Sequence, residues 1–235
     1  MLNFRGLRAP LLGGLGVPCR CCLGPLDGDA NWGICSPCWG GLVRPAEDRC
    51  PQCVLVHPEE EACPGGGAWV AGDAFWDYRG GRPALGALLV PGIKAGENGW
   101  RRALLAKAAR VDLPPWVEGT DFIVPAPTAP WKQWTRGRDL AMDWALHLGE
   151  RTGIPVRAVL RKAWFHPPQA GRPESARRRM PRKAIRLADP RPVAEARILL
   201  VDDVWTTGTT LLRCAQALQA GGASELRVLT LFRAV

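Results

Sequence analysis

The sequence ILLVDDVWTTGTTL, residues 198–211, combines a buried strand, two carboxylates, a turn rich in hydroxyl groups and the start of a helix. Its apolar run 198–201 predicts an interior parallel strand that ends at Asp202 and Asp203. Two acids at the end of a strand can hold the adjacent hydroxyls of a sugar. In the turn that follows, Gly208 permits close backbone approach, so that N–H groups and hydroxyls converge on one small anion. The stretch therefore predicts a site for a phosphorylated sugar.

A helix is predicted directly after this turn, over residues 209–220, because Gly221-Gly222 ends the pattern. The positive end of its dipole adds to the anion site. An acid pair alone is often only solvated chain, and a threonine-glycine turn alone is often an ordinary helix cap, so their combination is what makes the pattern specific. The predicted sugar-phosphate ligands are Asp202, Asp203, Thr206, Thr207, Gly208, Thr209 and Thr210.

The composition divides the chain into two parts. With 235 residues it is long enough for one medium domain and a small module. The first 66 residues hold eight of the nine cysteines, with many glycines and prolines, and the composition changes near residues 64–68. We therefore predict a cysteine-rich module over residues 1–66 and a second domain over residues 67–235.

The second domain alternates apolar strands with helical stretches. Strands are predicted at residues 69–76, 122–125, 155–160, 197–201 and 225–232. Helices are predicted at residues 101–111, 138–151 and 209–220. This alternation predicts an α/β fold with a mainly parallel sheet and flanking helices. Ligands of such sheets bind at the carboxyl ends of the strands, which is where Asp202 lies.

The spacing of the cysteines predicts a structural zinc site. Two C-x2-C pairs, each in a tight turn, can complete one tetrahedron of thiolates around a metal ion. The insert between them suits a zinc ribbon. The four predicted ligands are Cys19, Cys22, Cys35 and Cys38.

A third C-x2-C pair, Cys50 and Cys53, predicts a second zinc site with an incomplete ligand set. The remaining ligands are Cys63 together with either His57 or Cys21. Cys214, on the helix after the threonine turn, is predicted to be a packed core residue rather than a reactive thiol.

The rival explanation of the cysteines is a disulfide framework, which requires a secreted protein. Residues 11–17 are too short and glycine-rich to serve as the apolar core of an export signal. No apolar run in the sequence is long enough to span a bilayer. Reduced thiols that bind zinc in the cytoplasm are therefore the favoured interpretation.

The strand, acid pair and threonine turn resemble the phosphoribosyl pyrophosphate (PRPP) motif of type I phosphoribosyltransferases. Joined to a cysteine-rich head, they resemble the ComF family, whose members pair an N-terminal zinc ribbon with a phosphoribosyltransferase-like domain. Residues 123–127, IVPAP, are similar to the V-P-x-P strand end of that family. The loosest similarity is that of Ile93-Lys94 and Gly96 to its K-x-x-G element.

Two further segments resemble the family in part. Residues 136–139, RGRD, stand where the family has R-G-F-N and keep Gly137. Gln169 followed by Arg177 resembles its Q…R-x-x-N segment, with Met180 in the place of the asparagine.

The resemblance implies that Asp202 and Asp203 are catalytic: they orient the ribose hydroxyls and favour the positive charge that develops on the sugar. Magnesium accompanies PRPP and bridges hydroxyl and pyrophosphate oxygens. By the family pattern, the pyrophosphate faces Ala126, Arg136, Gly137, Lys162 and Arg177.

Charge suggests a second activity. The net charge is +9, and residues 161–186 contain nine Lys or Arg against one acid, Glu174. Such a basic segment can bind the phosphates of single-stranded DNA, and the flanking aromatic residues Trp131, Trp134, Trp164 and Phe165 can stack on unpaired bases. The predicted nucleic-acid contacts are Arg172, Arg177, Arg178, Arg179, Arg182 and Lys183.

Two functions therefore remain open at this stage. One is a ComF-like enzyme of DNA uptake and natural transformation that transfers phosphoribose from PRPP to an unidentified acceptor. The other is a non-catalytic competence factor that binds single-stranded DNA and uses PRPP only as a regulatory ligand. Competence or recombination proteins are expected partners of either.

Overall fold

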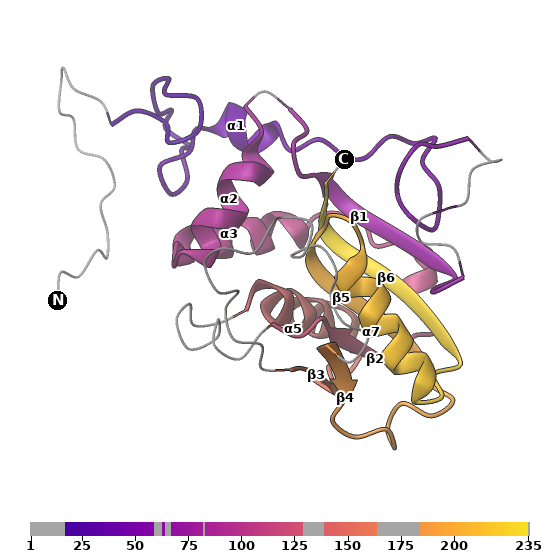
Figure 1. Ribbon diagram of the computed structural model, residues 1–235. Helices are drawn as coiled ribbons and strands as arrows, with labels where there is room; N and C mark the ends of the chain where they lie inside the picture. Colours follow the sequence, from indigo (N-terminus) through magenta and orange to yellow (C-terminus); the bar gives the residue numbers. More distant parts are fainter. Residues whose placement is uncertain are drawn as a thin grey trace, which may run out of the picture.

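The computed structural model in Figure 1 describes residues 17–58, 63, 67–81, 83–128, 139–163 and 184–234. At its centre is a four-stranded sheet in which every neighbouring pair of strands is parallel. This confirms the predicted mainly parallel sheet. In spatial order the strands are β1 (Ala71–Asp77), β6 (Glu225–Arg233), β5 (Arg197–Trp205) and β2 (Phe122–Pro125).

The central strand β5 forms because its apolar residues supply both faces of the sheet. Ile198 and Leu200 pack into one core, and Leu199 and Val201 pack into the other. This alternation is the two-residue period of a strand that is covered on both sides.

β5 is longer than predicted. The prediction that it ends at Asp202 and Asp203 is wrong, because β6 continues beside it and pairs with it as far as Trp205. The pairing with β2, by contrast, stops at Val201. The two acids therefore lie just beyond the end of β2, with a neighbouring strand on one side only.

Helices cover both faces of the sheet. The core on one face contains α2 (Leu85–Lys94), α3 (Asn98–Ala108) and α5 (Leu140–Thr152). The opposite core contains α7 (Thr209–Ala220) together with a small antiparallel hairpin of β3 (Leu160–Lys162) and β4 (Ile185–Leu187). In Figure 1, α7 lies along β5 and β6. Two short helices, α1 (Ser36–Gly40) and η1 (Pro115–Val117), complete the described elements.

Two sequence predictions fail in the middle of the chain. The strand predicted at residues 155–160 is reduced to one bridge between Val156 and Ile123, because β2 offers only four residues and the chain then turns into β3. Helix α2 was not predicted, since Pro91 and Gly92 interrupt the helical pattern. Gly92 is required there because a Cβ atom would lie 2.3 Å from the ring of Trp100.

The cysteine-rich segment packs against the sheet domain on both sides. Arg20 Nη2 donates to Glu97 Oε1 at 2.8 Å, and Arg49 Nη2 donates to Asp73 Oδ1 at 2.7 Å. Cys19 belongs to the core of α2 and α3, whereas Cys53 belongs to the core of α7.

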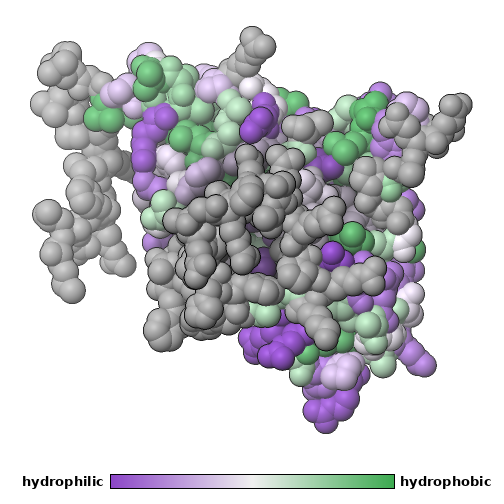
Figure 2. Space-filling model, in the orientation of Figure 1, coloured by the Kyte–Doolittle hydropathy of each residue, from purple (hydrophilic) through white to green (hydrophobic). Residues whose placement is uncertain are grey.

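The cysteine-rich segment exposes several large hydrophobic residues. Figure 2 shows hydrophobic residues along the upper edge of this face, over that segment. Its exposed large hydrophobic residues are Val17, Leu23, Trp32, Val43 and Val56. Within the described ranges, no helix is both long and apolar enough to cross a membrane.

Candidate functional site

The acid pair, Asp202 and Asp203, lies at the carboxyl end of β5 between the two helical layers. Asp203 Oδ2 is 2.6 Å from Lys94 Nζ at the end of α2. Asp202 lies on the other side, close enough to Cys214 of α7 for its charge to raise the pKa of that thiol. Its own Oδ1 accepts a hydrogen bond from the Asp203 N–H at 2.8 Å. The two carboxylates therefore approach the sheet edge from its opposite faces.

The electrostatics of the site favour a proton on Asp202. Burial raises the pKa of Asp202 well above its ordinary value, and the negative charge of Asp203 raises it further. Burial alone lowers the pKa of Lys94, but the carboxylates of Asp203, Asp202 and Asp139 together outweigh burial, so that the pKa of Lys94 is raised and the lysine stays charged.

A third carboxylate, Asp139, completes the acidic cluster. Its side chain caps α5 by accepting a hydrogen bond from the Ala141 N–H at 3.2 Å. Burial raises the pKa of Asp139, and the charge of Asp203 adds to that rise, while a hydrogen bond with Thr128 opposes it. Sequence reasoning did not include Asp139 or Lys94 among the site residues. The available signals were an aspartate at a helix N-cap and a weak similarity to a K-x-x-G element.

The threonine loop, residues 206–210, joins β5 to α7. Gly208 adopts φ +74°, and a Cβ atom there would lie 2.9 Å from Trp205 Nε1, so both conformation and space require glycine. The hydroxyls of Thr207 and Thr209 are 2.9 Å apart. Helix α7 begins at Thr209, and the N–H groups of a first helical turn have no partner within the helix. The loop therefore combines hydroxyl donors with a helix N-terminus, an arrangement suited to a phosphate group.

Arg233, at the end of β6, forms hydrogen bonds with the backbone at the start of this loop. Its role was not predicted from the sequence. Its side chain is 3% exposed. Nη1 donates to the carbonyl oxygens of Trp205 at 2.7 Å and of Thr206 at 2.6 Å. Nε donates to the carbonyl of Cys53 at 2.9 Å.

Of the residues predicted to face pyrophosphate, the structure describes two, Ala126 and Lys162. The Ala126 N–H donates to the Val201 carbonyl at 2.8 Å, so the first N–H after Pro125 is used within the sheet and is not available to an anion. Lys162 lies in β3 and is close enough to Cys214 to lower the pKa of that thiol. Arg136, Gly137 and Arg177 lie outside the described residues.

The predicted nucleic-acid contacts also lie outside the described residues. They are Arg172, Arg177, Arg178, Arg179, Arg182 and Lys183. The same holds for the aromatic residues Trp131, Trp134, Trp164 and Phe165, and for Gln169 and Met180.

The first cysteine cluster (Cys19, Cys22, Cys35 and Cys38) has the geometry of a zinc site. The Sγ atoms of Cys19 and Cys38 are 3.9 Å apart, and those of Cys22 and Cys35 are 3.7 Å apart. Tetrahedral zinc with Zn–S bonds of about 2.3 Å places its sulfurs about 3.8 Å from one another. Disulfide sulfurs would be about 2 Å apart, and all nine cysteines are unbridged. The disulfide alternative is therefore excluded for this cluster.

Backbone N–H groups favour thiolate at Cys19 of this cluster. Burial raises the pKa of Cys19, but N–H groups of Cys22, Cys35 and Cys21 outweigh burial and lower that pKa to about 6. The thiolate is the form that binds metal. Burial and the neighbouring thiols raise the pKa of Cys38, so its proton would leave only when a metal binds, and the fit of the cluster to zinc rests on its sulfur geometry.

The second cysteine cluster consists of Cys50, Cys53, His57 and Cys63. Its ligand atoms all lie within 4.8 Å of one another, and the Sγ atoms of Cys50 and Cys63 are 3.7 Å apart. The structure therefore selects His57 and Cys63; Cys21 instead hydrogen-bonds with Cys38 in the first cluster. The hydrogen bond of 2.9 Å between His57 Nδ1 and the Pro58 carbonyl assigns the proton to Nδ1, which makes Nε2 the atom suited to a metal. This set can also hold zinc.

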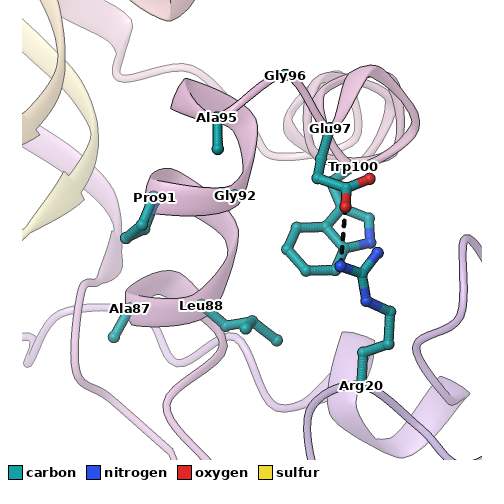
Figure 3. Close-up of a pocket in the computed structure, with 9 residues that line it drawn as sticks. All are labelled: Arg20, Ala87, Leu88, Pro91, Gly92, Ala95, Gly96, Glu97 and Trp100. Carbon is teal, nitrogen blue, oxygen red and sulfur yellow. Dashed lines mark hydrogen bonds and ion pairs between the residues drawn. The ribbon is translucent and has the colours of Figure 1, made fainter.

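A groove of about 610 Å³ is lined by residues of α2, by the start of α3 and by Arg20 of the cysteine-rich segment (Figure 3). Arg20, between Cys19 and Cys21, reaches across it to Glu97, and its guanidinium lies 4.2 Å from the ring centroid of Trp100. Pro91 and Ala95 form the α2 wall of the groove, whereas Lys94 is not part of its lining. The groove is thus distinct from the acid pair, and Arg20 anchors the first cluster to α3.

Cys214 is fully buried, and burial raises the pKa of its thiol well above the ordinary value. The prediction of a cysteine packed in the core is confirmed.

Comparison with known protein families gives a match in the C-terminal part of the chain. Residues 135–234, which include the acid pair and the threonine loop, match the family described as the phosphoribosyl transferase domain. The match spans less than half of the chain. A search of curated proteins finds no match.

Solved structures with partial similarity include a glutamine PRPP amidotransferase from B. subtilis in complex with ADP and GMP. It has 24% identity and a TM-score of 0.35 over 55% of this chain and 25% of the other. A second is an allosteric regulatory enzyme of purine biosynthesis, with 25% identity and a TM-score of 0.33 over 54% of this chain and 23% of the other. A purine phosphoribosyltransferase from Pyrococcus horikoshii has 16% identity and a TM-score of 0.33 over 63% of this chain and 87% of the other. This chain thus spans about a quarter of each of the first two.

The parallel sheet, the flanking helices and the family match agree with one another. The chain contains a type I phosphoribosyltransferase-like domain, and its cysteine clusters can hold zinc.

Proposed function

We propose that this protein binds PRPP with magnesium and transfers its phosphoribosyl group to an acceptor. The observation that carries the proposal is the position of the acid pair directly before the threonine loop, at the carboxyl end of β5 and within the matched segment. Ligands of open α/β sheets bind at that end of the strands.

Each part of this site suits one part of PRPP. The threonine loop and the N-terminus of α7 would hold the 5-phosphate, since they present N–H and hydroxyl donors to an anion. Asp202 and Asp203 would hold the ribose hydroxyls and stabilise the positive charge that develops when the anomeric C–O bond breaks. The carboxylate oxygens are ligands of the kind magnesium prefers, and the ion, when bound, would neutralise the pyrophosphate that leaves.

Lys94 is the cation that faces the acid pair. One lysine faces three carboxylates, Asp203 at 2.6 Å and Asp202 and Asp139 at longer range. We infer that Lys94 holds Asp203 through their ion pair, while the raised pKa of Asp202 favours its protonated form until a cationic or hydroxyl-rich ligand favours the charged form. Binding of PRPP with magnesium would then release that proton.

The remaining parts of the proposal concern the whole chain. Residues 1–66 would form a module held by two structural zinc ions, one in each cysteine cluster, and residues 67–235 would form the PRPP-binding domain. Reduced, metal-bound thiols of this kind belong to a cytoplasmic protein. The combination is that of a ComF-like protein, with a role in DNA uptake and natural transformation and with competence or recombination proteins as partners.

Turnover is tested by pyrophosphate release from PRPP against a panel of nucleobases, amines and DNA. The control is the double variant Asp202→Asn/Asp203→Asn, which keeps the size of both side chains. We expect acceptor-dependent, magnesium-dependent release that the double variant lacks. Release that is equally fast in the double variant would contradict the assignment of these acids.

A second function, binding of single-stranded DNA with PRPP as a regulatory ligand, is favoured by the nine Lys and Arg among residues 161–186. Affinity carried by phosphate contacts falls steeply with salt. We expect a fluorescence titration to give such salt-dependent binding, and the triple variant Arg177→Ala/Arg178→Ala/Arg179→Ala to weaken it. Binding that is absent, or insensitive to salt, would exclude this function.

A further inference from the structure

We propose that Arg233 is a positioning residue that joins the second cysteine cluster to the threonine loop, so that metal bound in that cluster tightens the binding of a phosphate group by the loop. The inference rests on the proposed function of the loop as the 5-phosphate site. It assigns to the second cluster a role in ligand binding, in addition to any role in stabilising the cysteine-rich segment.

The guanidinium of Arg233 forms a direct connection between the two sites. Its Nε donates to the carbonyl of Cys53, which is a ligand residue of the second cluster, at 2.9 Å. Its Nη1 donates to the carbonyls of Trp205 and Thr206, where the threonine loop begins, at 2.7 and 2.6 Å. These hydrogen bonds span 180 and 28 residues of sequence, so one planar group fixes two distant backbone segments relative to each other.

The indole of Trp205 forms a second connection along the same path. It packs edge-to-face against Trp69, with ring centroids 5.3 Å apart, and the guanidinium carbon of Arg233 lies 5.0 Å from its ring centroid. Trp69 Nε1 donates to the Gln52 carbonyl, inside the C-x2-C turn of the second cluster, at 2.7 Å. Trp205 also contacts the loop: its Nε1 lies 2.9 Å from the position that a Cβ atom on Gly208 would take. Movement of the cluster turn would therefore be transmitted to the loop glycine through two indoles packed edge-to-face.

The space around this path leaves little room for adjustment. A Cβ atom on Gly72 would lie 2.5 Å from the Gln52 carbonyl oxygen and 3.1 Å from the Trp205 ring. The Gly72 N–H donates to the Pro51 carbonyl at 2.8 Å, which ties the cluster turn to strand β1. Tightly packed elements of this kind shift together rather than deform.

Metal in the second cluster would set the position of the Cys53 carbonyl. Cys53 is fully buried, and its sulfur and that of Cys50 reach the site from the two ends of one tight turn. Three thiolates and a neutral imidazole around Zn²⁺ leave one net negative charge, which the cation of Arg233 offsets. Without the ion the sulfurs have no common partner, and the free energy that holds the turn in place is lost.

A simpler explanation is that Arg233 attracts the phosphate by charge alone. Lysine distinguishes the two explanations, since it keeps the charge but has a single nitrogen that cannot reach both the Cys53 carbonyl and the loop carbonyls. Attraction by charge predicts that Arg233→Lys binds as well as the wild type, and positioning predicts that it does not.

The test uses ribose 5-phosphate, which carries the 5-phosphate without the pyrophosphate, and the full zinc-loaded chain in a calorimetric titration. The variants are Arg233→Lys and Cys53→Ser. Arg151→Lys is the matched control, because Arg151 also donates to backbone carbonyls, those of Ala108 and Val111, but at the far ends of α3 and α5. Cys22→Ser, which removes a ligand of the first cluster, is the control for loss of zinc as such.

We expect Arg233→Lys and Cys53→Ser to bind ribose 5-phosphate about tenfold more weakly than the wild type, in the usual range of coupling between sites. The two controls should stay within about twofold of it. Zinc content and melting temperature, measured on every variant, show which ion is lost and whether the chain is folded. If Cys53→Ser does not fold, His57→Ala replaces it, since His57 is outside the core.

Wild-type affinity in either Arg233→Lys or the second-cluster variant would overturn the inference. An equal loss in Cys22→Ser would overturn it as well, because the effect would then not be specific to the second cluster. If the wild-type chain itself does not bind ribose 5-phosphate, the proposed function of the loop fails instead.

Discussion

Replacing Asp202 by asparagine should make the protein more stable at neutral pH while it removes the ligand site. The carboxyl group of Asp202 is partly buried near Cys214 of α7 and faces the negative charge of Asp203, and burial and this charge both raise its pKa in the folded state. Asparagine keeps the shape of the side chain and its capacity to accept the hydrogen bond from the Asp203 N–H, but it has no charge to bury. A more stable variant would show that the wild type keeps the Asp202 carboxylate for function at a cost in stability.

The sign and size follow from proton linkage. Between the unfolded pKa of an aspartate, about 3.9, and the raised folded pKa, the folded chain binds more protons than the unfolded chain. The contribution of Asp202 to stability is therefore complete below pH of about 4 and falls as pH rises, by up to about 1.4 kcal/mol for each pH unit within that window. Asp139 has a raised pKa of the same kind, but it is present in both proteins and largely cancels from their difference.

The assay is urea unfolding of the zinc-loaded wild type and Asp202→Asn at pH 5, 6 and 7, followed by the fluorescence of the tryptophans. The variant should gain stability relative to the wild type with each step in pH. Asp189→Asn is the control, because Asp189 is exposed and its hydrogen bond from Arg191 lowers its pKa. A difference between wild type and Asp202→Asn that does not change with pH would refute a raised pKa at this position.

Three further outcomes follow from the same geometry. Gly208→Ala should lose about 1–2 kcal/mol of unfolding free energy, because alanine is strained at φ +74°, and it should also weaken ribose 5-phosphate binding; Gly153→Ala, at the same φ with nothing within 4 Å, should lose stability alone. Lys94→Met should lose about 1 kcal/mol at pH 7 in urea unfolding, since Asp203 is left without its partner and solvent screens part of the loss; unchanged stability would contradict a role of Lys94 in holding that charge. Metal analysis should find two equivalents of zinc in the wild type and one in Cys22→Ser; a wild type without zinc would contradict both cluster assignments.

The parts of the fold that the sequence predicts well are those with a strong local pattern. β2 and α7 occur at the predicted residues, because an apolar run of four and a helix bounded by Gly208 and Gly221 are unambiguous. The extension of β5 to Trp205 could not be predicted in the same way. It depends on β6 as a partner, and the residues involved include two acids that disfavour a strand.

The site is predicted where it is continuous in sequence and missed where tertiary packing assembles it. The acid pair and the threonine loop lie within nine residues of one another, and spacing alone identifies both. Lys94 and Arg233 come from other elements, and either reads as an ordinary surface cation until the fold buries its partners. The choice of His57 over Cys21 likewise needed coordinates, since both lie at plausible spacing from the third cysteine pair.

The most direct test of the central claim is a calorimetric titration of the full chain with PRPP, with and without magnesium. The account predicts binding that requires magnesium, is accompanied by proton release to the buffer, and is lost in Asp202→Asn/Asp203→Asn while Asp189→Asn binds as the wild type does. Equal PRPP affinity in the wild type and the acid-pair variant would contradict the account.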